Sequence, residues 1–168
     1  MNKHFLYFAY GSNMSLRRIS ARVSSIEKVS IAYLSGYQLK FHKVSKKDGS
    51  GKCDVVGSGN SQDKVYGVLY KIRADELSEL DRFEANGYGY KRQNTFVTTD
   101  SGESLEAEIY IATNIDPNIR PYYWYKEHVV RGAKENELPN TYISMLNEVV
   151  CEIDPDTERQ TTELAIYG

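Results

Sequence analysis

The sequence predicts a single α+β domain over residues 1–168, with a sheet that is curled or barrel-like. Strand-like segments fill the first two-thirds of the chain and helical segments close it. Few of these strands are separated by a segment long enough for a parallel crossover, which favours a curled sheet over an open parallel one. A chain of 168 residues can also bury one substantial core.

The expected strands are rich in aromatic and β-branched residues. The first, over 4–10, is an unbroken apolar run that predicts a buried central strand and ends at the turn Gly11-Ser12-Asn13. Two later segments alternate well enough for an antiparallel pair joined by a turn at 100–102. The segments expected in strands are 4–10, 25–33, 36–44, a short 53–56, 64–72, 90–99 and 104–112.

The expected helices are marked by periodicity and by proline. A short helix begins over 15–19, and a second covers 73–84. Pro121 suits the first position of a third helix, with Tyr122, Tyr125 and Val129 on one face. Pro139 starts a fourth, in which Tyr142, Leu146 and Val149 are spaced for burial.

Glu84 is the residue that first indicates chemistry. On the wheel of the second helix it shares one stripe with Leu77 and Leu80, so its carboxylate is expected to point inward. An inward carboxylate must be paired, hydrogen-bonded or raised in pKa, and a raised pKa suits a general base. The alternatives are that this last-turn residue swings out to solvent, or that it pairs with Lys91 or Arg92.

The turn after the first strand is the second candidate site. Gly11 allows a ligand to approach the main chain, and the amides that follow it begin a helix. Free N–H groups at a helix start favour an anionic oxygen, such as a carboxylate or a developing oxyanion. The alternative is an ordinary tight turn in which Ser12, Asn13 or Ser15 caps the helix.

Charge and composition exclude several classes of partner. The net charge is −2 and no long run of Lys or Arg occurs, so a nucleic-acid surface is not expected. The basic segment 43–52 is interrupted by Ser, Gly and Asp, which indicates a solvated loop. No apolar run is long enough for a membrane span, and the chain leads straight into the first strand, so we expect a cytoplasmic protein without a signal peptide.

Cysteine and histidine do not indicate a metal. Cys53 and Cys151 are far apart, and the three histidines (His4, His42 and His128) show no ligand spacing. Neither a structural metal site nor a disulfide framework is therefore expected.

Three segments together resemble a known family. Residues 5–14, Phe-Leu-Tyr-Phe-Ala-Tyr-Gly-Ser-Asn-Met, look like the opening segment of the gamma-glutamylcyclotransferase family. Residues 80–84, Leu-Asp-Arg-Phe-Glu, resemble the helix end that bears its catalytic glutamate. Residues 132–139, followed by Tyr142, are similar to a third segment, typical of the branch that acts on gamma-glutamyl amino acids.

The resemblance implies a small mixed β-barrel with flanking helices and a reaction that needs no cofactor. The α-amine of a gamma-glutamyl group attacks its own side-chain carbonyl, giving 5-oxoproline and a free amine. Glu84 matches the proton-transferring acid. Where the family commonly has glycine after the glutamate, this chain has Ala85. The residues that match substrate-binding positions are Tyr7, Phe8, Ala9, Tyr10, Gly11, Ser12, Asn13, Tyr90 and Tyr125.

Several alternatives remain open at this point. The leaving amine could be a lysine side chain or an acylated aminoglycoside instead of an amino acid. The domain could also be a non-catalytic module that binds a small ligand. A homodimer formed through exposed aromatic residues at 122–124 is a further alternative.

Overall fold

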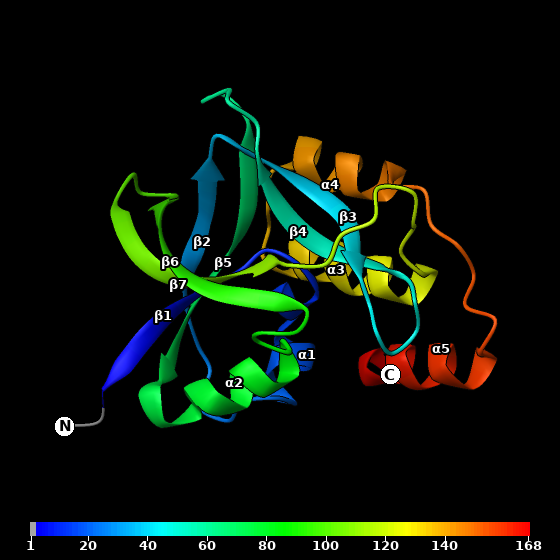
Figure 1. The fold of residues 1–168 in the computed structure, drawn as a ribbon. Coiled ribbons are helices and arrows are strands. Elements are labelled where there is room, and N and C mark those ends of the chain that lie inside the picture. The colour runs from blue at the N-terminus through cyan, green and yellow to red at the C-terminus, as the bar shows by residue number, and fades with distance from the viewer. Residues whose placement is uncertain (1–2) are drawn as a thin grey trace.

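The computed structural model describes residues 3–168 and shows a closed barrel with helices packed around it (Figure 1). Residues 1–2, which also bear on the expectation of no signal peptide, lie outside the described part. The barrel order is β1-β5-β2-β6-β7, and the parallel contact of β1 with β7 closes it. Its strands are β1 (His4–Ala9), β2 (Glu27–Ser35), β5 (Lys64–Arg73), β6 (Tyr90–Thr99) and β7 (Ser104–Ala112). The predicted α+β class with a mixed barrel is confirmed.

A second, two-stranded sheet pairs β3 (Tyr37–Val44) with β4 (Gly51–Gly57). It takes up both ends of the basic segment 43–52, so the solvated loop that its composition indicates is only 45–50, where Lys46 and Lys47 are exposed. Lys43 lies in β3 and is buried, and Lys52 lies in β4 with its side chain largely covered. The short strand expected at 53–56 is therefore longer, and it includes Lys52.

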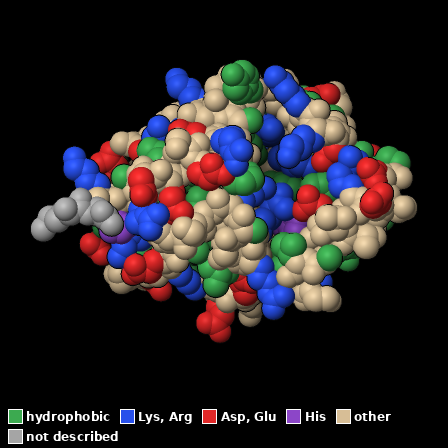
Figure 2. All heavy atoms as spheres, turned by 90° about the horizontal axis from the view of Figure 1, so that it is seen from below, with side chains coloured by type: hydrophobic (Ala, Val, Ile, Leu, Met, Phe, Trp, Pro, Cys, Tyr) green, Lys and Arg blue, Asp and Glu red, His purple; other side chains and the backbone are tan. Residues whose placement is uncertain are grey.

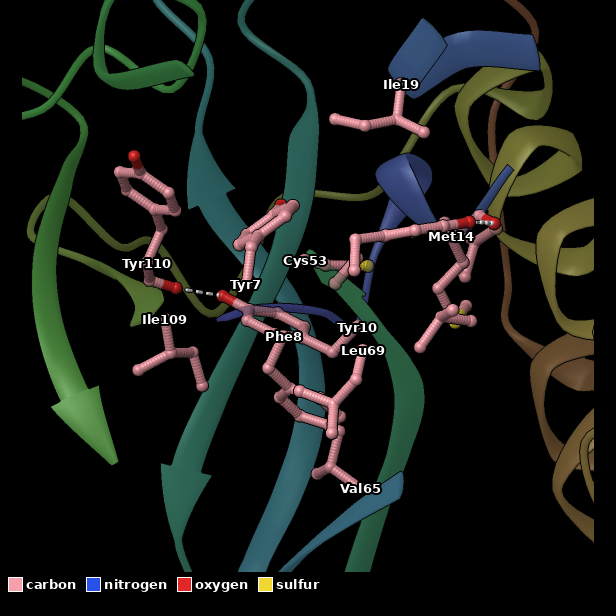
Figure 3. Close-up of a cluster of buried hydrophobic side chains, with 14 of the residues drawn as sticks. Tyr7, Phe8, Tyr10, Met14, Ile19, Cys53, Val65, Leu69, Ile109 and Tyr110 are labelled. Carbon is pink, nitrogen blue, oxygen red and sulfur yellow. Dashed lines mark hydrogen bonds between the residues drawn. The ribbon is translucent and has the colours of Figure 1, made fainter. Parts of the chain in front are cut away.

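The barrel core is built from β1 and β5, which pair antiparallel with Phe8 opposite Leu69 and Ala9 opposite Val68. All four of these residues are buried, as the apolar run over 4–10 predicts. A Cβ at Gly67 would lie 2.4 Å from the carbonyl oxygen of Ala9, so only glycine allows the strands to approach here. Figure 3 shows these strands with buried side chains around them.

Helices cover one end and one side of the barrel (Figure 1). At the lower end lie η1 (Ser12–Met14), α1 (Leu16–Ser20), η2 (Ala74–Glu76) and α2 (Leu77–Phe83). At the side lie α3 (Tyr123–Glu135), α4 (Asn140–Glu148), α5 (Thr157–Leu164) and η3 (Ala165–Tyr167). The segment 73–84, expected as one helix, opens with a 3₁₀ turn before the α-helix begins.

The third and fourth helices begin one or two residues later than the positions of Pro121 and Pro139 predict. The third helix begins at Tyr123 instead of Pro121, because Tyr122 is extended and pairs with Glu152 as an isolated bridge. Pro139 is the residue just before the fourth helix and not its first member. The sequence reading missed α5, whose eight residues contain no buried side chain and whose start is fixed by Asp156 accepting from the Arg159 amide.

The aromatic segment 122–124 is not the exposed cluster that was expected. Trp124 is buried, and its indole N–H donates to Asp154 at 2.8 Å. Tyr123 is the member that remains exposed. This surface therefore offers less for a dimer contact than the sequence suggests.

Candidate active site

Glu84 caps the C-terminal end of α2 and points inward. Its amide donates to the Leu80 carbonyl at 3.0 Å, which keeps it on the helical path beside the fully buried Leu80. Only 13% of its side chain is exposed, although the residue lies in the last turn. The inward orientation expected from the helix wheel is what the structure shows.

The partner of Glu84 comes from the turn after β1. The Asn13 side-chain amide donates to Glu84 Oε1 at 2.6 Å and also to the Tyr7 hydroxyl at 3.1 Å. Arg22 donates to Asn13 Oδ1 at 3.0 Å and lies 3.7 Å from Glu84 Oε1. Asn13 is thus held between the guanidinium and the carboxylate, so its amide faces the acid in one fixed orientation.

The pairing of Glu84 with Arg92 or Lys91, considered from the sequence, does not occur. Arg92 is occupied by Asp81 at 2.9 Å and Glu108 at 3.2 Å. Capping of the first turn by a side chain does not occur either, because Asn13 is committed to Glu84. Glu84 and Asn13 therefore pair with each other, and both line the pocket described below.

Burial raises the pKa of Glu84 above its ordinary value of 4.5. The positive charges of Arg22, Arg18 and Lys43 and the hydrogen bond from Asn13 oppose this effect without cancelling it. The net effect is a pKa raised above its ordinary value, which makes the carboxylate a better base than an ordinary glutamate.

The turn opposite Glu84 presents main-chain donors. Residues 12–14 form the 3₁₀ turn η1, in which the Met14 amide donates to the Gly11 carbonyl. The amides of Ser12 and Asn13 have no acceptor within residues 3–168, as expected for the start of a helical turn. Gly11 has a φ of −116°, so its backbone conformation does not require glycine. Glycine is favoured here because a Cβ would lie 3.0 Å from the Cβ of Cys53.

Helix α3 holds this turn in place. A Cβ at Gly132 would lie 2.6 Å from the Ser15 amide and 2.7 Å from Met14 Cβ, so glycine lets the helix pack directly on the turn. The Met14 carbonyl accepts from Asn136 at 3.0 Å and from the Tyr70 hydroxyl at 2.8 Å. Residues 132–139, the third segment that resembles the family, therefore support the turn that ends residues 5–14, the first such segment.

A pocket of about 290 Å³ joins these parts. It collects the glutamate, the turn and five tyrosines from separate segments of the chain. The lining residues are Tyr7, Tyr10, Gly11, Ser12, Asn13, Cys53, Glu84, Tyr90, Tyr110 and Tyr125. Phe8 and Ala9, expected among the binding residues, belong instead to the barrel core and do not line it.

Tyr90 and Tyr125 are fixed by the same residue of β4. The Tyr90 hydroxyl donates to the Cys53 carbonyl at 2.7 Å, and the Tyr125 hydroxyl accepts from the Cys53 amide at 3.0 Å. Burial raises the pKa of both phenols well above 10, so they stay neutral. Tyr125 keeps its own proton free to donate into the pocket, and Tyr90 keeps lone pairs free to accept.

Four residues of this region were missed by sequence reasoning. Cys53 and Tyr110 line the pocket, Arg22 orients Asn13, and Lys43 acts on Glu84 through its charge. No periodic pattern connects them to Glu84, since they come from β4, β7, the segment after α1 and β3. The Tyr10 hydroxyl, which donates to the Tyr110 carbonyl, ties the end of β1 to β7 (Figure 3).

The described residues offer no site for a metal. Within residues 3–168, no group of three or more His, Cys, Asp or Glu side chains could hold an ion, and Cys53 and Cys151 are free thiols. Over the same residues, none of the helices has the length and apolar character needed to cross a membrane.

Comparison with known proteins shows the family of the chain. A model of the AIG2-like family matches residues 64–146, which run from β5 into α4 and include Glu84 and Tyr125. A gamma-glutamylcyclotransferase of Bos taurus is 35% identical over 150 residues, which is 86% of this chain and 78% of the relative. That of Homo sapiens is 33% identical over the same shares. The chain belongs to the gamma-glutamylcyclotransferase family.

Solved structures show the same architecture. The structure of a gamma-glutamyl cyclotransferase superposes with a TM-score of 0.82 at 28% identity, over 96% of this chain and 99% of that one. A yeast gamma-glutamyl cyclotransferase specific to glutathione superposes with a TM-score of 0.65 at 12% identity, a likeness of fold alone.

Proposed function

We propose that this chain converts a gamma-glutamyl amine, with a gamma-glutamyl amino acid as the expected substrate, into 5-oxoproline and the free amine. Curated relatives at 33–35% identity carry the name of that activity. The observation that carries the proposal is the buried Glu84 carboxylate, held by Asn13 at 2.6 Å, in one pocket with the free amides of the 12–14 turn.

Ring closure needs little from the enzyme except positioning and proton transfer. The reaction is intramolecular, so most of the entropic barrier disappears once the substrate is held in a folded conformation. The α-ammonium, whose pKa is about 8 in solution, must first lose a proton. Glu84 is the base for that step, and the raised pKa of its carboxyl makes it a better base than an ordinary glutamate.

The next steps use the rest of the pocket. The amine nitrogen attacks the side-chain carbonyl carbon, and negative charge develops on the carbonyl oxygen. The amides of Ser12 and Asn13 are donors for that oxygen or for the substrate carboxylate, and one well-aimed donor contributes about 3 kcal/mol. The bond to the leaving nitrogen breaks as Glu84 gives its proton to that nitrogen. The regenerated carboxylate takes the remaining extra proton from the ring nitrogen, which becomes the lactam N–H, and passes it to the departing amine. The reaction needs no cofactor.

The experiment is incubation of the purified chain with a panel of gamma-glutamyl amines while 5-oxoproline is measured. We expect release from gamma-glutamyl-alanine to exceed release from ε-(gamma-glutamyl)-lysine. The reverse order would assign a lysine side chain as the leaving group, and activity only on an acylated aminoglycoside would assign that class. Binding without any 5-oxoproline would instead make the domain a ligand-binding module.

Location and assembly are proposed with the activity. A cytoplasmic protein acting on a small molecule, with no nucleic-acid or membrane partner, agrees with the composition and with the narrow pocket. A homodimer is a separate proposal, which light scattering of the purified chain tests directly. A monomer at micromolar concentration would refute it.

A further inference from the structure

A second cavity continues outward from the pocket that contains Glu84. It is open to solvent, spans about 990 Å³ of empty space and shares four lining residues with the inner pocket: Ser12, Glu84, Tyr90 and Tyr125. A substrate whose carbonyl lies beside Glu84 can therefore extend its leaving group into this outer cavity.

The outer cavity is strongly basic. Among the described residues, seven cationic side chains line it and only three carboxylates do. Figure 2 shows Lys and Arg side chains gathered around a hollow on the face seen from below. The cations are Arg18, Arg22, Lys43, Lys46, Lys47, Lys52 and Arg159, and the acids are Asp48, Glu84 and Glu163.

Some of these cations are already paired within the protein. Arg18 lies 2.7 Å from Glu163, and Lys52 lies 3.0 Å from Asp48. Burial lowers the pKa of Lys52 to about 8, so it remains positively charged at neutral pH. The surplus of positive charge therefore does not disappear through internal ion pairs.

Among the described residues, three cations of the cavity form no ion pair (Lys43, Lys46 and Lys47), and Lys43 is the buried one. The residue is only 8% exposed, and its ammonium forms no hydrogen bond and no ion pair with residues 3–168. Its contacts are the ring of Tyr90, 4.8 Å from the ammonium, and the backbone of Gly89. The ammonium itself is not fully buried and is accessible from the cavity that Lys43 lines, so an anionic ligand there can supply the acceptor that the described residues do not.

We propose that the outer cavity selects gamma-glutamyl substrates whose leaving amine is an acidic amino acid or an acidic peptide, with Lys43 binding its extra carboxylate. The inference rests on the proposed function and adds the chemistry of the leaving group. Lys43 lies next to the shared wall at Tyr90, on the side of the pocket toward which the departing amine extends. Lys46 and Lys47 supply further positive charge at the same cavity.

The test compares two dipeptides of the same shape. The values of kcat/KM for gamma-glutamyl-glutamate and gamma-glutamyl-glutamine are measured by 5-oxoproline release at pH 7. Only the glutamate compound can form a charge-assisted hydrogen bond with Lys43 through its extra carboxylate. We therefore expect its kcat/KM to exceed that of the glutamine compound by about tenfold or more. We also expect that ratio to fall as salt is added. A ratio of one or below would overturn the inference.

Two variants test whether Lys43 is the residue responsible for the preference. Lys43→Met keeps the length of the side chain and removes its charge, and it should bring the ratio close to one. Lys40→Met is the matched control, since Lys40 is an exposed lysine of the same strand that does not line the cavity, and it should keep the wild-type ratio. Equal loss of the ratio in both variants would show a nonspecific charge effect and refute the role of Lys43.

The outcomes separate this inference from the proposed function. Release of 5-oxoproline from both dipeptides without preference overturns the acidic leaving group and leaves the cyclotransferase standing. No release from either dipeptide or from gamma-glutamyl-alanine overturns both. The wild-type ratio decides the matter even if Lys43→Met does not fold.

Discussion

Replacing Glu84 with glutamine removes the proton carrier and leaves most of its contacts. Glutamine has the same shape, and its Oε1 can still accept from the Asn13 amide, which now donates at 2.6 Å. It also keeps a polar atom toward Arg22 at 3.7 Å. The fold and the binding of substrate should therefore be retained, because the change is confined to one ionisable group.

The expected loss follows from the proton transfers that the acid performs. General acid–base catalysis contributes about 10²–10⁴-fold, so Glu84→Gln should lower kcat by at least about 10²-fold, which corresponds to about 2.7 kcal/mol in the barrier. The assay is 5-oxoproline release from gamma-glutamyl-alanine at saturating substrate, with thermal unfolding to confirm the fold.

The control is Glu79→Gln in the same helix, whose side chain pairs with Arg82 at the surface. It should turn over at the wild-type rate. A Glu84→Gln protein that turns over within about threefold of wild type would refute the assignment of Glu84 as acid and base.

Three further predictions concern stability and the support of the site. Folding raises the pKa of Glu84 above 4.5, so the stability that this group confers is complete below that pH and declines as pH rises through the folded pKa. Glu84→Gln should therefore gain stability relative to wild type between pH 4 and 7. A difference in urea unfolding that stays constant over this range would contradict the prediction. Ala85 has a φ of +49°, so Ala85→Gly should stabilise the protein by about 0.5–1 kcal/mol, and a lower midpoint of unfolding would show that the strain is absent. Gly132→Ala should cost about 1–3 kcal/mol and reduce kcat/KM, since its Cβ meets the backbone of the turn, whereas Gly57→Ala, with open space around it, should do neither.

The sequence predicts most of the fold because local patterns decide it. The apolar run over 4–10, the alternation at 90–99 and 104–112, and the wheel that turns Glu84 inward are all present in the structure. Each depends on spacing within one segment, where the periodicity of strands and helices can be read directly.

The parts that could not be predicted depend on contacts between distant segments. Asn13 was expected to bind substrate or cap a helix, and its commitment to Glu84 across 71 positions has no local signal. The lysines at 43 and 52 read as solvated because composition does not reveal that a β3–β4 sheet turns them into a cavity. Helix α5 escaped notice because it buries none of its side chains and so shows no apolar stripe.

The most direct test of the central claim is the pKa of the Glu84 side chain, measured by NMR titration of its carboxyl carbon. The signal is assigned by its absence in Glu84→Gln. Burial of the acid predicts a pKa above the ordinary value of 4.5 in the free protein. A pKa at or below 4.5 would show that Asn13 and the nearby cations outweigh burial, and that result would contradict a single acid that both takes and returns the proton.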